Sequence, residues 1–337
     1  FGNMKFDVII GNPPYQLSTG EGTSQAIPLY NKFVEKSLEL NPKYITMIIP
    51  SRWMMGGIGL NSFREKMIAD KRISYMIDYE SSSDIFPEVN IDGGVCYFLW
   101  DYKHNGKVNH SFTSLTGEKI HSKRYLKVAY HDKVIRDPRQ LSIIKKVNIT
   151  KGKRFSSLVS KDAYRMKSYL FSSPERISGV SLSDSHKEGF VKIYGNIGKA
   201  GGSKRTHKYI NKDSIKNNKD SINKYKMFFS KAYTMTATVP PEIIMGEPGE
   251  ICTETFLKIG DFNSKEEMNN ALSYIKTKFF RALLDYNRNS LNVTIESFSL
   301  IPLQDFSKSW TDEELYKKYK LTQEEIDYIE DNIEPMN

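Results

Sequence analysis

The chain has few cysteines and no long uninterrupted apolar run, and each lack excludes a class of protein. Only Cys96 and Cys252 occur in 337 residues, which excludes a disulfide-stapled fold and favours a reducing, cytoplasmic location. No apolar run approaches the roughly 18 residues that a membrane span needs, so no membrane partner is expected. The two cysteines and six histidines lack metal-ligand spacing, and no metal is expected. His104 and His110, close in sequence, are interpreted as surface-loop residues.

The net charge of +9 is unevenly distributed. Residues 1–100 contain 9 Lys and Arg against 11 Asp and Glu, whereas residues 101–258 contain 31 against 14. Residues 259–337 return to an acidic balance, with 9 against 15. A cationic central block is typical of a protein that binds a polyanion such as DNA. Lysines that merely solubilise the fold are the alternative.

The first hundred residues alternate between short apolar runs and amphipathic segments. A helix is expected at 29–38, ending before Asn41-Pro42, and another begins at Asn61 as its cap. This pattern predicts an α/β fold with a largely parallel sheet, whose ligands bind at the carboxyl ends of the strands. The first strand, 6–10, is expected to be buried on both faces. The other predicted strands are 44–49, 73–79 and 94–100.

The stretch Asp7-Val8-Ile9-Ile10-Gly11-Asn12-Pro13-Pro14-Tyr15 carries the strongest chemical signal. The side-chain oxygen of Asn12 and the carbonyl of Pro13 can each accept a hydrogen from an amino group on a flat ring. Such acceptors favour a pyramidal nitrogen that can attack a methyl group, which stabilises the transition state. The prolines stiffen the turn, and Tyr15 offers a ring on which a base can stack. A purely structural rigid turn is the alternative.

This segment resembles the catalytic motif of adenine-specific (N6) DNA methyltransferases from bacterial restriction–modification systems. The resemblance continues through the following helix, strand and turn, the later base-flanking motif, and a C-terminal segment. These further segments are Pro28 to Lys36, Thr46 to Trp53, Ile85 to Pro87 with Gly93 to Trp100, and Ile301 to Leu315.

The resemblance implies S-adenosylmethionine as cofactor, double-stranded DNA as partner, and an endonuclease domain or subunit as a further partner. Asn12, Pro13, Pro14 and Tyr15 would hold an adenine flipped out of the duplex, since the amine is out of reach inside it. Phe86 would contact the base from another side, with a packed strand-end residue as the alternative. Phe33 would lie near the cofactor, with helix core as the alternative. The fold implied is part of a Rossmann-like methyltransferase sheet, followed by an α+β target-recognition domain and a helical C-terminus.

The chain departs from the family pattern because it contains no Phe-x-Gly-x-Gly cofactor loop. Gly56 to Gly59 and Gly195 to Gly202 are rich in glycine, but neither has the context of such a loop and neither is assigned to the cofactor. We therefore expect the chain to be the C-terminal part of a longer enzyme, inactive on its own.

Four regions are predicted. They are the C-terminal half of the catalytic domain (1–103), connecting strands and a helix (104–150), the target-recognition domain (151–262) and a helical region (263–337). In the third, a flexible glycine-containing loop flanked by Tyr194 and Tyr209 is expected to bind DNA through Lys199, Lys204, Arg205, His207 and Lys208. A ligand-free surface hairpin is the alternative.

Capped helices are predicted to begin at Ser264, Thr311 and Thr322, and the first is expected to run through Leu283. Two other functions stay open. One is an RNA or protein-glutamine methyltransferase that shares Asn-Pro-Pro-Tyr, and the other is a DNA-recognition fragment without catalytic activity.

Overall fold

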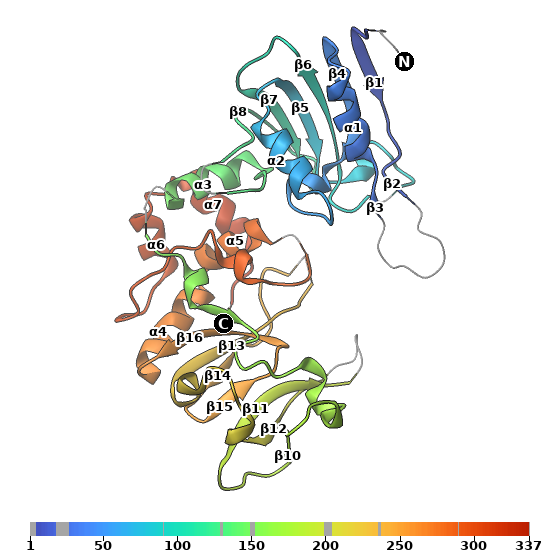
Figure 1. Cartoon of the computed structure of the whole chain (residues 1–337). Helices are drawn as coiled ribbons and strands as arrows, with labels where there is room; N and C mark the ends of the chain where they lie inside the picture. Colours follow the sequence, from blue (N-terminus) through green and yellow to red (C-terminus); the bar gives the residue numbers. More distant parts are fainter. Residues whose placement is uncertain are drawn as a thin grey trace. The chain divides into compact units, whose positions relative to one another are not determined.

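A computed structural model describes residues 5–17, 27–89, 91–128, 131–148, 152–198, 204–234, 237–288 and 290–336. The chain divides into two compact units, Phe1–Ser142 (unit 1) and Ile143–Asn337 (unit 2) (Figure 1). The strands of the predicted connecting segment 104–150 extend the sheet of unit 1. Within the described ranges, no helix is long and apolar enough to cross a membrane.

Unit 1 is built on a six-stranded sheet of order β1-β4-β6-β5-β7-β8. The strands are β1 (Val8–Gly11), β4 (Tyr44–Pro50), β5 (Ile73–Tyr79), β6 (Val95–Asp101), β7 (Val108–Thr113) and β8 (Lys119–Arg124). The pairs β1/β4 and β5/β7 are parallel, and the other three neighbouring pairs are antiparallel. The α/β class is confirmed, but the expectation of a largely parallel sheet is wrong. Between β5 and β6 the described residues form one helical turn, the short 3-10 helix Ser82–Asp84, so β6 turns back beside β5 and enters the sheet antiparallel.

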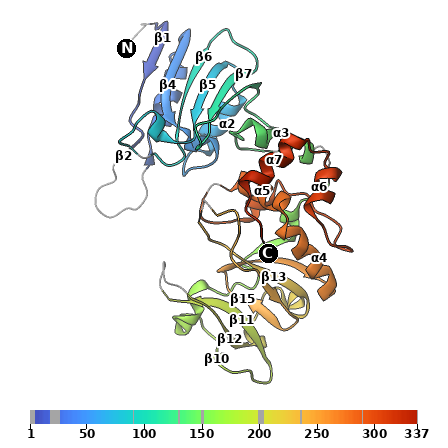
Figure 2. The same ribbon diagram turned by 180° about the vertical axis from the view of Figure 1, so that it is seen from behind.

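Two helices, α1 (Tyr30–Glu39) and α2 (Asn61–Ala69), cover one face of this sheet (Figures 1 and 2). The helices form where the sequence predicts them, because Val34 and Phe63 face a core that includes Trp53 and Trp100. Asn61 is not the cap of α2. The N-cap residue is Leu60, and the Asn61 side chain accepts a hydrogen bond from Arg64 instead.

The opposite face of the sheet carries exposed apolar side chains. Val8 and Ile10 on β1 are 49% and 78% exposed, and Tyr44 on the neighbouring β4 and Tyr75 on β5 are also exposed. The prediction that the first strand is buried on both faces is therefore wrong. Among the residues that can be described, β1 pairs only with β4, so it is an edge strand of this sheet.

Strand direction brings several chain turns to one edge of the sheet. Since β1, β4, β5 and β7 run the same way, the residues that follow them meet at that edge, together with the start of β6. We call this edge the carboxyl rim, made of residues 12–15, 51–54, 80–94 and 114–118. The short strands β2 (Gln16–Leu17) and β3 (Ile27–Pro28) pair with each other after the first of these turns.

Unit 2 contains two four-stranded sheets, β10-β12-β11-β15 and β14-β13-β16-β9. Their strands are β9 (Val159–Lys161), β10 (Leu182–Ser183), β11 (Phe190–Ile197), β12 (Lys204–Asn211), β13 (Tyr225–Ser230), β14 (Ile244–Gly246), β15 (Glu250–Cys252) and β16 (Phe256–Phe262). The helices are α4 (Lys265–Lys276), α5 (Lys278–Asn287), α6 (Asp312–Lys318) and α7 (Gln323–Asn332), while α3 (Pro138–Asn148) spans the boundary between the units.

The predicted caps at Ser264, Thr311 and Thr322 are confirmed. The single helix expected from 264 through Leu283 is wrong, because the backbone of Thr277 is extended and separates α4 from α5. The Thr277 side chain accepts a hydrogen bond from the N–H of Phe280 and caps the second helix.

Candidate active site

The Asn-Pro-Pro-Tyr segment forms the first turn of the carboxyl rim. Asn12 and Pro14 are exposed, whereas Pro13 is buried. Upstream, β1 is fixed by its pairing with β4; downstream, the N–H of Leu29 donates to the carbonyl of Tyr15 over 3.1 Å. The two prolines have no N–H to compete for an acceptor. The segment is therefore held at both ends, with the Asn12 amide accessible to solvent.

The ring of Tyr15 is only partly accessible to a stacking base. Its side chain is half-buried and packs against the core of unit 1. Its hydroxyl oxygen is buried and has no hydrogen-bond partner among the residues described. Burial raises the pKa of Tyr15, and the nearby Cys96 thiol adds to the rise. The phenol therefore stays protonated at neutral pH.

Phe33 lies on the solvent side of α1. It is 44% exposed, whereas its neighbour Val34 is completely buried. The alternative that Phe33 is helix core is therefore wrong, and the ring is accessible to a flat ligand.

Phe86 lies in the rim loop between β5 and β6 and is half-buried. The buried side chain of Ser82 closes this loop, since its hydroxyl donates to the carbonyl of Val89 and accepts from the N–H of Ile91. Phe86 itself donates its N–H to the carbonyl of Ser82 over 2.7 Å. The strand that precedes Phe86 lies three positions from β1 in the sheet, about 14 Å away at ordinary strand spacing. The loop must cross the end of β6 to approach a base held at Asn12.

A buried ion pair lies directly behind the rim. Asp78, at the end of β5, is completely buried and accepts two hydrogen bonds from Arg136, over 2.7 and 2.6 Å. It also accepts one from the hydroxyl of Ser51, over 2.7 Å. Arg136 further donates to the carbonyls of Gly93 and Tyr79. The sequence reasoning missed this pair, although one acidic residue in an otherwise apolar strand signals a buried carboxylate that needs a cation.

His110 lies beside this pair and corrects another prediction. It belongs to β7, is 2% exposed, and its Nε2 lies 4.0 Å from Asp78 Oδ2. Burial lowers the pKa of His110 to about 4, and of His131 to about 4 as well. The surface-loop assignment is wrong for His110, because β7 adds a strand to the sheet and directs this ring into the core. Among the described residues, no group of His, Cys, Asp and Glu could hold a metal ion.

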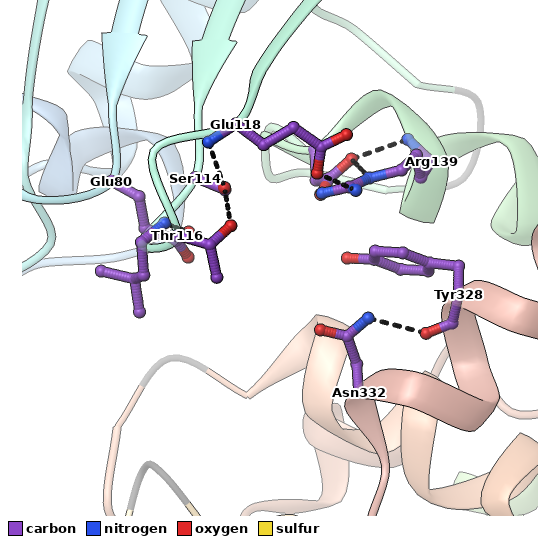
Figure 3. Close-up of polar contacts among 9 residues, drawn as sticks. Glu80, Ser114, Thr116, Glu118, Arg139, Tyr328 and Asn332 are labelled. Carbon is purple, nitrogen blue, oxygen red and sulfur yellow. Dashed lines mark hydrogen bonds and ion pairs between the residues drawn. The ribbon is translucent and has the colours of Figure 1, made fainter.

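The rim turn after β7 is fastened to the start of α3 (Figure 3). The Ser114 hydroxyl accepts from the N–H of Glu118 and shares a hydrogen bond with Thr116. The Glu118 carboxylate accepts from Arg139, which also pairs with Asp137. The chain thus leaves unit 1 through a segment tied to the carboxyl rim.

The predicted DNA-binding residues do not form one flexible loop. Lys199 lies outside the described residues, and the other four belong to β12. Successive side chains of a strand point to opposite faces, so Arg205 and His207 share one face while Lys204 and Lys208 lie on the other. Arg205 donates to the Glu242 carbonyl and to Ser230, and Lys208 pairs with an aspartate.

The face with His207 carries a row of rings, which we call the ring ladder: Tyr194, His207, Tyr209 and His186. Successive ring centroids lie 6.0, 5.9 and 5.6 Å apart. The Lys192 ammonium lies 4.7 Å from the Tyr194 ring and 3.2 Å from a Glu250 oxygen. The two tyrosines are those that the sequence placed beside the expected loop.

The N-terminal part of the chain is similar to known proteins in two comparisons. Residues 1–86 match the family of the Eco57I restriction-modification methylase. Over 111 residues the chain is 48% identical to a Mycoplasma pneumoniae (strain ATCC 29342 / M129 / Subtype 1) protein described as an uncharacterized adenine-specific methylase, covering 32% of this chain. The chain spans about a quarter of that relative's length, 26%. The resemblance indicated by the Asn-Pro-Pro-Tyr segment is confirmed.

Two solved structures are similar at low identity. The type IIG restriction endonuclease BpuSI is 12% identical, with a TM-score of 0.38. The match covers 94% of this chain and 49% of the BpuSI chain. The type IIL restriction-modification enzyme MmeI, solved in complex with DNA, is 10% identical with a TM-score of 0.38, covering 87% and 45%.

Proposed function

We propose that the chain is the methyl-transferring and DNA-recognising part of an adenine-specific (N6) DNA methyltransferase of a restriction–modification system. The observation that carries the proposal is the exposed Asn12 amide, held by two prolines at the carboxyl end of a strand, inside the segment that matches a methylase family. Ligands of α/β sheets bind at such ends.

The chemistry follows from what the turn offers. The Asn12 side-chain oxygen and the Pro13 carbonyl accept the two hydrogens of the adenine amine, which favours a pyramidal nitrogen with its lone pair free. Because these acceptors are fixed before the reaction, little reorganisation is needed as positive charge develops on nitrogen. Pro13, which is buried, anchors the turn, and Tyr15 and Phe86 supply ring surface for a base removed from its stack.

The residues of this chain fit part of an S-adenosylmethionine site. The exposed ring of Phe33 suits a flat group, and S-adenosylmethionine supplies the methyl group when bound. The turn at Gly56 to Gly59 has a structural reason of its own. Gly57 has a φ of 105°, and a Cβ there would lie 2.5 Å from Leu60. We therefore keep the turn unassigned.

The uncovered face of unit 1 supports the proposal that further protein completes this domain. On this face Val8 and Ile10 of β1, which pairs in parallel with β4, are exposed together with Tyr75 of β5. A surface of this kind favours burial against another segment or subunit. We propose that this additional part carries the rest of the cofactor site, and that the isolated chain does not transfer methyl groups.

For the DNA-binding surface, we propose the ring ladder of unit 2 in place of a cationic loop. Aromatic and imidazole rings on one strand face suit contacts with sugars and unstacked bases, and Lys192 adds a cation beside Tyr194. The central block from 101 to 258, with 31 cationic side chains against 14 acidic ones, favours a nucleic acid over a protein substrate. Lys199 keeps its proposed role.

The direct test is methyl transfer from labelled S-adenosylmethionine to duplex DNA by the full protein that contains this chain. We expect label on adenine, and Asn12→Ala should remove it. Transfer to RNA or to a protein glutamine instead would support the alternative methyltransferases. Salt-dependent DNA binding with no transfer by the full protein would support a recognition fragment without catalysis.

A further inference from the structure

The buried contact between Asp78 and Arg136 joins separate turns of the carboxyl rim. Asp78 receives Ser51, the first residue of the turn after β4, and Arg136, from the segment that enters α3. The guanidinium also holds the carbonyl of Tyr79 at the end of β5 and the carbonyl of Gly93 before β6. The Asp78–Arg136 pair therefore joins the turn after β4, both ends of the loop between β5 and β6, and the segment that enters α3.

The hydrogen bonds that Arg136 donates depend on the planar shape of its guanidinium. Arg136 uses Nε and one terminal nitrogen for the carboxylate, and both terminal nitrogens for the two carbonyls. Its side chain is 13% exposed and that of Asp78 is completely buried. A lysine ammonium is a point charge without this planar fork and cannot satisfy the same set.

The fixed turns have little freedom to adopt other arrangements. Gly94 has a φ of 77°, and a Cβ at this position would lie 2.0 Å from the carbonyl oxygen of Tyr79. Gly93 lies against the backbone of Arg52, with 3.7 Å from its ideal Cβ to the Arg52 Cα. The N–H of Ser51 donates to the carbonyl of Gly94. The turns after β4 and before β6 are thus packed on each other. Arg136 adds a hydrogen bond to the second of these turns, at the carbonyl of Gly93.

The held turns belong to the rim that carries the proposed catalytic residues. The Ser51 turn follows β4, the direct neighbour of β1, and Asn12 follows β1. The Gly93 turn ends the loop that carries Phe86. A pair that served stability alone could lie anywhere in the sheet. The bidentate pair of Arg72 and Asp70 does lie at the opposite end, where β5 begins.

We propose that Arg136 is a positioning residue for methyl transfer, acting through Asp78 and Ser51 to hold the turns around the flipped base in one arrangement. This inference rests on the proposed function. Neither Arg136 nor Asp78 touches the reacting atoms. Loosening the arrangement should therefore reduce the turnover of bound DNA more than it reduces the affinity for DNA.

The test compares Arg136→Lys with Arg72→Lys in the full protein, because each removes a bidentate pair from the same sheet. For Arg136→Lys we expect kcat to fall about 10- to 100-fold, as misplaced reacting groups do, while KM for duplex DNA changes less than about threefold. For Arg72→Lys we expect both constants to stay within about threefold of the wild type. Folded fraction is measured on each sample by circular dichroism, and kcat is calculated per folded molecule.

A milder variant covers the case in which Arg136→Lys unfolds. Ser51→Ala removes a single hydrogen bond to Asp78, and we expect kcat to fall about three- to tenfold with the fold intact. Methylguanidine added to Arg136→Ala should restore part of the turnover without changing KM. Wild-type kcat per folded molecule in Ser51→Ala, or in folded Arg136→Lys, would overturn the inference. Absence of methyl transfer by the wild type would instead contradict the proposed function itself.

Discussion

The two units differ in how their sheets are built and in what covers them. Unit 1 has a mixed sheet with helices on one face and exposed apolar side chains on the other, and its first 86 residues match a methylase family. Unit 2 has two sheets of mostly antiparallel pairing, with many rings from separate elements buried together. The difference supports the proposal that methyl transfer belongs to unit 1, whose exposed sheet face further protein would cover, and that DNA recognition belongs to unit 2.

The largest expected effect falls on chemistry in unit 1. Asn12→Ala in the full protein should lower the rate of methyl transfer by about a thousandfold, because one preplaced acceptor of the amine is lost. DNA affinity should change by less than about threefold, since the proposed recognition surface is in the other unit. Transfer is measured with labelled cofactor and affinity by filter binding. Lys71→Ala, an exposed cation before β5, is the control. A large loss of affinity in Asn12→Ala would break the proposed division of labour.

The next effect concerns the backbone of the rim. Gly94→Ala should lower the free energy of unfolding by about 3 kcal/mol or more, since its Cβ would overlap a carbonyl oxygen. Gly59→Ala shares a positive φ, 74°, but meets open space, so about 1 kcal/mol is expected. Urea unfolding of the two variants measures both values. Equal losses would mean that the packing of the two turns is not as described.

Acid should weaken unit 1 more than unit 2. Burial holds the pKa of His110 and of His131 at about 4, whereas an unfolded histidine titrates near 6.5. Between these pKa values the unfolded state binds more protons than the folded state. The free energy of unfolding therefore falls as the pH drops from about 6.5 to about 4, by up to about 1.4 kcal/mol per pH unit for each histidine. His110→Phe should flatten this dependence, and His186→Gln, an exposed ring of unit 2, should not. Hydrogen exchange resolved by unit provides the measurement. An unchanged slope in His110→Phe would contradict the assigned burial.

The smallest effect distinguishes the two faces of β12. Replacing His207 and Tyr209 together by alanine should weaken binding to duplex DNA by about tenfold, because two rings of the ladder are lost. Replacing Lys204 and Lys208 together, on the opposite face, should change affinity by less than about threefold. Titration at several salt concentrations separates the two results. If the lysine replacements weakened DNA binding more than the ring replacements, the cationic face of β12 would be the DNA-binding surface.

Much of unit 1 could be predicted from the sequence because its signals are local. The runs that form β4, β5 and β6 are mostly apolar, and the Asn12 turn is marked by two prolines. The direction of β6 could not be read, since it depends on which neighbour the strand joins. The Asp78–Arg136 pair was also missed, because its members lie 58 residues apart and only folding brings them together.

Unit 2 was harder to predict. The caps at Thr311 and Thr322 are local patterns and were found, whereas the break at Thr277 interrupts an apolar stripe that continues on both sides. The cations from 204 to 208 look like a basic loop in sequence, but they alternate along a strand that pairs with β11. A charge count carries no information about which face each side chain occupies.

The central claim is that the Asn12 turn presents an adenine amine for methylation, and nucleoside analysis tests it most directly. DNA is isolated from cells that express the full protein, or its Asn12→Ala variant, and is digested and analysed by mass spectrometry. N6-methyladenine with the wild type, lost with the variant, is the predicted result. Methylation on cytosine alone, or adenine methylation that survives Asn12→Ala, would contradict the assignment.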